Sequence, residues 1–185
     1  MKRSAIKNSV LKISLTALSS CMICICAWIA IPIGGVPMTL QTFGVAFAGF
    51  LLGARGGVCA TAVYLALGAV GLPVFAGFGG SLAFLAGPTG GFLIGFLFLS
   101  LFCGLASRHT SGKRIFFFLL ATVGLLCCHL AGVFWFAHVA GISHAQAFLV
   151  SSLPYLPKDV IAVLFAGFLI GKLRKRLPRV PCFSR

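Results

Sequence analysis

The placement of charge along this chain restricts the folds that it can adopt. Long apolar segments separate short stretches that carry fifteen Lys and Arg residues and a single acid, Asp159. When the apolar segments are taken as membrane spans, fourteen of the fifteen bases fall on one side of the membrane, and only Lys158 falls on the other. Lys and Arg of membrane proteins concentrate in cytoplasmic loops. The pattern therefore predicts a multi-pass protein of the cell membrane with both termini in the cytoplasm.

Six apolar segments satisfy this charge pattern and predict an all-α membrane protein. The mean hydropathy of +1.12 and the 9% charged residues differ from a soluble domain, where about a quarter of residues are charged. A helix needs about 20 apolar residues to cross a bilayer. We expect one integral membrane domain over residues 1–173 and a basic cytoplasmic tail over residues 174–185. The predicted spans are residues 10–31, 38–53, 56–72, 89–106, 115–140 and 158–173.

The same composition disfavours several function classes. The net charge of +14 does not indicate nucleic acid binding, because the bases cluster at segment ends without a basic face interleaved with aromatics. Seven of the eight cysteines lie in or beside apolar segments, where Cys packs as a small apolar residue, so we expect no metal and no cofactor. One Asp and no Glu exclude two-carboxylate acid–base chemistry, and no P-loop motif is present. We expect a protein that is not an enzyme.

Proline and glycine concentrate in the connections predicted on the outer side. These connections, residues 32–37, 73–88 and 141–157, hold six of the eight prolines. Proline fixes φ and glycine permits positive φ, so such loops can adopt defined shapes. Residues 73–88 are too apolar for a solvated linker, and we expect them to pack over the helix ends as a lid. The prediction is a bundle with short cytoplasmic turns and structured outer loops.

The single charged pair on the outer side predicts a ligand site at the start of the last span. Asp159 would accept N–H donors from a polar ligand, while Lys158 would balance its charge or meet a ligand anion. The alternative is structural. Asp159 would then stabilise a helix N-terminus, and Lys158 would reach the membrane interface by snorkelling.

Two other predicted spans begin with polar residues. Thr39 and Gln41 open the second span, and an amide in an apolar helix bonds either a neighbouring helix or a ligand. Thr89 opens the fourth span, either as a helix N-cap or as a ligand contact. Gly90 beside it permits the close approach of a helix or of a ligand.

Aromatic residues of the outer connections are candidates for the walls of an apolar pocket. Phe75, Phe78 and Tyr155 suit that role, although Tyr155 equally suits anchoring at the membrane interface. His129 and His138 lie nine residues apart, on opposite faces of the fifth span. We therefore interpret both as helix-packing groups and not as joint metal ligands.

Small residues recur four apart in the first span. They permit a close helix contact, either within this chain or with another subunit. These residues are Ala17, Cys21, Cys26 and Ala30.

Four ordered motifs carry a family resemblance. They are residues 33–42, 64–77, 87–95 and 157–159. With these motifs the chain resembles the BioY family, the biotin-binding membrane subunits of energy-coupling-factor (ECF) transporters, over about residues 10–173. The resemblance implies a six-helix substrate-binding subunit that captures biotin from the outer side. It also implies a transmembrane coupling subunit and a pair of cytoplasmic ATPases as partners.

The resemblance also assigns roles to residues. Asp159 would accept the ureido N–H groups of biotin, and the motifs around Gln41, Thr89 and the Phe75–Gly77 stretch would enclose its rings and tail. Three positions depart from the family pattern. Lys158 stands where Gly is usual, Ala162 stands where Lys is usual, and Phe92 stands where Tyr is common.

Other functions remain compatible with the sequence. The nearest alternative is the same architecture serving another small vitamin, such as riboflavin or thiamin. A membrane enzyme acting on lipid or isoprenoid and a purely structural assembly subunit are less favoured. The first would need a cluster of acids, and the second gives no reason for ordered outer loops around an acid.

Overall fold

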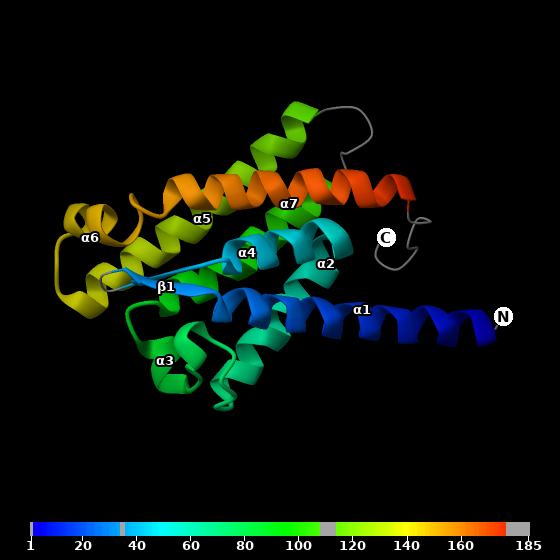
Figure 1. Cartoon of the computed structure of the whole chain (residues 1–185), viewed down its shortest axis with the longest axis horizontal. Helices are drawn as coiled ribbons and strands as arrows, with labels where there is room; N and C mark the ends of the chain where they lie inside the picture. Colours follow the sequence, from blue (N-terminus) through cyan, green and yellow to red (C-terminus); the bar gives the residue numbers. More distant parts are fainter. Residues whose placement is uncertain (1, 34–35, 108–113, 177–185) are drawn as a thin grey trace.

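The chain forms helices joined by short connections, with one small hairpin near its N-terminal third (Figure 1). We describe residues 2–33, 36–107 and 114–176 of a computed structural model. The elements are α1 (Lys2–Trp28), β1 (Ala30–Ile33), β2 (Val36–Thr39), α2 (Gln41–Ala69), the 3-10 turn η1 (Ala76–Phe78), α3 (Leu82–Ala86), α4 (Gly90–Ala106), α5 (Arg114–Ala140), α6 (His144–Ser151) and α7 (Leu156–Arg176).

The predicted all-α membrane class is confirmed. Three helices, α1, α2 and α5, are long and apolar enough to cross a bilayer, and α6 with α7 forms a fourth candidate that bends by 57°. The shorter helix α4 is apolar along its 17 residues. The six predicted spans fall on α1, the two halves of α2, α4, α5 and α7, and their number stays a prediction.

Helix α2 contains the predicted turn between the second and third spans. Gly53 has φ 77° and ψ 177°, a conformation that an L side chain rarely adopts, and the chain reverses there. After the reversal the two halves of α2 lie against each other, since a Cβ added at Gly57 would lie only 2.6 Å from Gly49 Cα. Arg55 is exposed at this turn, as expected for a base between two spans.

The first predicted span ends earlier and the second begins later than expected, because a β-hairpin lies between α1 and α2. Residues 30–33 and 36–39 were expected partly in helices, but they pair as antiparallel strands in the register Ala30↔Thr39. Pro32 and Pro37 pair with each other, and proline within a helix would have removed a backbone hydrogen bond. Helix α2 therefore begins at Gln41 instead of residue 38. The hairpin tip, with Gly34 and Gly35 of the family-like motif, lies outside the described residues.

The outer connections have structure of their own. Residues 73–88 form η1 and α3, and residues 141–157 contain α6, which opens with a capping box between Ser143 and Gln146. The hairpin, α3 and α6 lie at one end of the bundle, whereas α1 begins and α7 ends at the other (Figure 1). The predicted tail beyond residue 176 and the bases Arg108 and Lys113 lie outside the described residues.

Only part of the row of small residues predicted in the first span is exposed on α1. Ala17 and Cys21 are exposed. Cys26 is buried against α2, where it lies 3.3 Å from a Cβ placed on Gly44, and Ala30 belongs to β1. A partner helix could therefore approach closely only along the first part of the stripe.

Candidate functional site

A cavity opens at the end of the bundle that carries the hairpin, α3 and α6. It contains about 610 Å³ of space between protein atoms, including its open mouth. Its walls come from segments that are far apart in the sequence. The residues that line it are Val36, Pro37, Thr39, Gln41, Thr42, Ala76, Phe84, Thr89, Phe92, Leu93, Phe96, Leu125, Cys128, His129, Ser151, Tyr155, Lys158 and Asp159.

Asp159 supplies the only carboxylate of the chain to the wall of this cavity. The residue is 6% exposed and lies in the first turn of α7. Its Oδ2 lies 3.3 Å from His129 Nε2, its Oδ1 lies 2.5 Å from Lys158 Nζ, and the Thr42 side chain also contacts the carboxylate. Among the described residues, no donor meets hydrogen-bond geometry at Oδ1, although the Lys158 ammonium is close. Oδ1 is thus a buried oxygen that lies against an ammonium.

Lys158 connects the start of α7 to the hairpin. Its Nζ donates to the backbone oxygen of Thr39 at 2.6 Å and forms the ion pair with Asp159. The side chain is 23% exposed. Lys158 therefore turns into the site, and snorkelling to the interface does not describe its position. The partners of the Asp159 carboxylate are likewise side chains, so the helix-cap alternative finds no support in its contacts.

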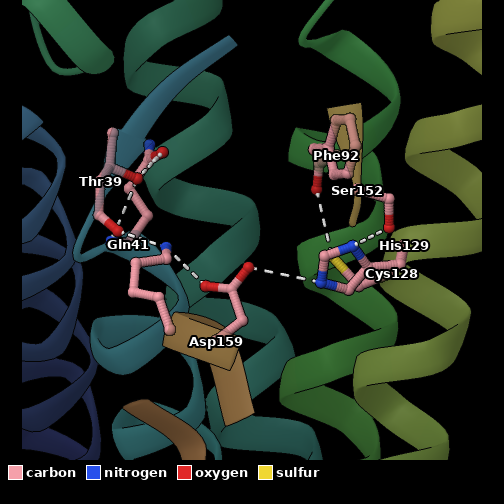
Figure 2. Close-up of polar contacts among 8 residues, drawn as sticks. Thr39, Gln41, Phe92, Cys128, His129, Ser152 and Asp159 are labelled. Carbon is pink, nitrogen blue, oxygen red and sulfur yellow. Dashed lines mark hydrogen bonds and ion pairs between the residues drawn. The ribbon is translucent and has the colours of Figure 1, made fainter. Parts of the chain in front are cut away.

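His129 belongs to the site, and its interpretation as a helix-packing group is corrected. From α5 it contacts Asp159 through Nε2 and lies 2.6 Å from Ser152 Oγ through Nδ1 (Figure 2). The nine-residue spacing between His129 and His138 indicates only that these two side chains do not converge on one metal ion. The signal that could have identified His129 is its polar side chain within an apolar helix. Its partner, Asp159, lies thirty residues later in the sequence. His138 is exposed, as a residue away from the site would be.

Thr39 and Gln41 extend the polar contacts into α2. The Thr39 hydroxyl donates to Gln41 Oε1 at 2.9 Å, and Gln41 Nε2 donates to the hydroxyl of Tyr64 at 2.5 Å. Gln41 thus bonds the second half of α2 and also lines the cavity, which combines the two predicted alternatives. Since Lys158 bonds Thr39, the contacts run without interruption from Tyr64 to Ser152.

Thr89 and Tyr155 also line the cavity. Thr89 occupies the N-cap position of α4, but its side chain makes no capping hydrogen bond. Tyr155 is 5% exposed and donates its hydroxyl proton to the backbone oxygen of Val36, so it is not an exposed interface anchor.

Four predicted site residues lie behind the cavity wall or away from it. Phe75 is fully buried between the rings of Tyr64 and Phe84, with centroids 5.5 and 5.2 Å away, and so supports the wall that Phe84 forms. Phe78 is 64% exposed and stacks on Trp28. Gly77 and Gly90 do not line the cavity. Any ligand contact of these four stays a prediction.

The arrangement suits recognition of a polar head on a mostly apolar small molecule. Aromatic and aliphatic side chains form one part of the wall, with Phe92, Phe96 and Leu125 among them. The Asp159 carboxylate and its polar neighbours form another part, and a few placed polar groups in a mostly apolar pocket orient a ligand.

Comparison with known proteins identifies close relatives. The sequence model of the BioY family matches residues 1–179. The probable biotin transporter BioY of Pyrococcus horikoshii is 36% identical over 163 residues, which cover 88% of this chain and 96% of that protein. The biotin transporter BioY of Thermotoga maritima is 38% identical over 159 residues, which cover 83% of this chain and 90% of that protein.

A solved structure agrees with the sequence matches. The crystal structure of the S-component for biotin from an ECF-type ABC transporter superposes with a TM-score of 0.87 at 29% identity. The alignment covers 96% of this chain and 98% of that one.

Proposed function

The chain belongs to the BioY family, and from this premise we propose that it binds biotin from the outer side of the cell membrane and hands it inward. It is a transport protein and not an enzyme. The observation that carries the proposal is Asp159, a buried carboxylate on the cavity wall and the only acidic side chain of the sequence. A ureido N–H of biotin is the kind of neutral donor that a carboxylate oxygen accepts.

The surroundings of Asp159 support a small, partly apolar ligand. The ureido head would meet Asp159, while apolar side chains such as Phe92, Phe96 and Leu125 would surround the remainder. Residues 73–88 contribute Ala76 and Phe84 to the wall, which supports the role of this segment as a lid. The proposal keeps Thr39, Gln41, Thr89, Tyr155 and Lys158 as binding residues, because all five line the cavity.

The orientation in the membrane follows from the charge pattern. The hairpin, α3 and α6 lie at the end of the bundle opposite the start of α1 and the end of α7 (Figure 1). These elements contribute Val36, Phe84 and Ser151 to the cavity wall, so with both termini cytoplasmic we infer that the cavity opens to the outside. We infer that an ECF module, consisting of a transmembrane coupling subunit and an ATPase pair, supplies energy to the chain. The structural neighbour is a component of such a transporter, and no P-loop motif occurs in this sequence.

The decisive experiment is a titration of the purified, partner-free chain with biotin, riboflavin and thiamin in parallel. We expect saturable binding of biotin and none of the other two at the same concentrations. Saturable binding of riboflavin or thiamin without biotin binding would show that the chain serves another vitamin with the same architecture. Absence of binding by a chain that shows a cooperative thermal transition would overturn the proposed function.

A further inference from the structure

His129 stands between the acid of the site and a buried hydroxyl. It is 6% exposed, and Ser152 is fully buried. The two ring nitrogens face different partners, since Nε2 lies 3.3 Å from Asp159 Oδ2 and Nδ1 lies 2.6 Å from Ser152 Oγ. The ring is also held from the side by Phe92, whose ring meets it edge-on at 5.9 Å between centroids. The imidazole is thus fixed on three sides.

Donor and acceptor chemistry determines which nitrogen carries the proton. A carboxylate only accepts hydrogen bonds, so Nε2 must carry a proton to interact favourably with Asp159. In a neutral ring, Nδ1 is then an acceptor, and the Ser152 hydroxyl donates to it. The carboxylate therefore selects this ring form, and the Ser152 hydroxyl complements it by donating to Nδ1.

This contact divides the carboxylate of Asp159 into two different oxygens. Oδ2 faces the imidazole donor, whereas Oδ1 faces Lys158 and has no hydrogen bond among the described residues. The carboxylate is consequently held in one orientation, between the imidazole on one side and the ammonium on the other.

We propose that His129, oriented by Ser152, is a positioning residue that holds the Asp159 carboxylate in the orientation that receives the ligand. This inference rests on the proposed binding of biotin at Asp159 and adds the group that prepares the acid for it. The role is indirect, because His129 acts through Asp159.

Substitutions at His129 separate positioning from packing. His129→Phe keeps a ring of similar size but removes the donor, and we expect biotin affinity to fall about tenfold or more. His129→Gln places an amide N–H near the position of Nε2, so it should stay within about threefold of wild type. His138→Gln, on the same helix but exposed, is the matched control and should bind as wild type does.

Each outcome decides between the alternatives. Wild-type affinity in His129→Phe would overturn the proposal. The same holds if His129→Gln binds biotin as weakly as His129→Phe while its melting temperature matches that of wild type. Should His129→Phe not fold, Ser152→Ala decides, with a loss of about threefold to tenfold expected and wild-type affinity contradicting the proposal. A wild-type chain that does not bind biotin would instead count against the proposed function.

Discussion

Replacement of Asp159 by Asn tests the site with the smallest change of shape. In the wild type, His129 Nε2 presents a donor to Oδ2 of this carboxylate. The oxygen of an Asn amide would take that position, so its NH2 group would point toward Lys158 and the ligand. A donor would then face the N–H of the ligand, and an acceptor would be lost where the ligand needs one.

The expected loss follows from the kind of hydrogen bond involved. Hydrogen bonds to a charged acceptor contribute about 1.5–3 kcal/mol, and Asp159 is only 6% exposed, so solvent replaces little of the loss. This corresponds to a dissociation constant for biotin that is weaker by about 10- to 150-fold. Asn is as good an N-cap as Asp, so a carboxylate that only stabilised the start of α7 would leave biotin affinity unchanged.

The assay is an isothermal titration of wild type and Asp159→Asn with biotin in the same detergent. A thermal melt of each protein without ligand serves as the folding control, since the substitution also removes the ion-pair partner of Lys158. Unchanged affinity in a well-folded variant would refute the reasoning and remove Asp159 from the site.

Three further predictions address topology, assembly and packing. In a cysteine-free background, a membrane-impermeant thiol reagent added outside should label Ser81→Cys but not Ser111→Cys, a position outside the described residues; outside labelling of the latter would contradict cytoplasmic termini. Ala17→Trp, on the exposed part of α1, should abolish transport in cells that supply an ECF module while biotin binding by the isolated chain survives, and transport at wild-type rate would remove α1 as the subunit contact. Gly104→Ala should destabilise the chain by about 1–3 kcal/mol in thermal melts, because the added Cβ would lie 2.3 Å from the backbone nitrogen of Ala54. Gly171→Ala is the control, since its Cβ would meet nothing within 4 Å. Equal melting temperatures of the two variants would refute the packing argument.

The fold was predictable where the membrane itself imposes a rule. Apolar length and the placement of bases gave the all-α class, and Arg55 marked the reversal of α2 to within two residues of Gly53. The hairpin was not predictable in this way, because Ala30, Ile31 and Met38 continue the apolar runs of the neighbouring helices. Strand pairing there depends on contacts across a turn, which hydropathy does not register.

The site was predictable to the extent that its residues stand out locally. Asp159, Lys158 and Gln41 are polar groups at the starts of apolar spans, and all three line the cavity. His129 was misinterpreted because its significance depends on α7 packing beside α5, a contact between elements that local spacing does not contain. Phe78 was expected in the pocket wall because it is an aromatic residue of an outer connection. Its residue type did not reveal that it would stack on Trp28 away from the cavity.

The pairing of charges within the cavity bears on which ligand fits best. The negative charge of Asp159 is already balanced by Lys158, whose ammonium lies 2.5 Å from Oδ1, before any ligand binds. A cationic group such as the thiazolium of thiamin would therefore meet a nearby ammonium without an unbalanced carboxylate to offset the repulsion. A neutral N–H donor needs only an acceptor lone pair, which Oδ1 retains. The lysine beside the acid thus favours a neutral ureido head over a charged one, although Ala162 stands where the family usually has its lysine.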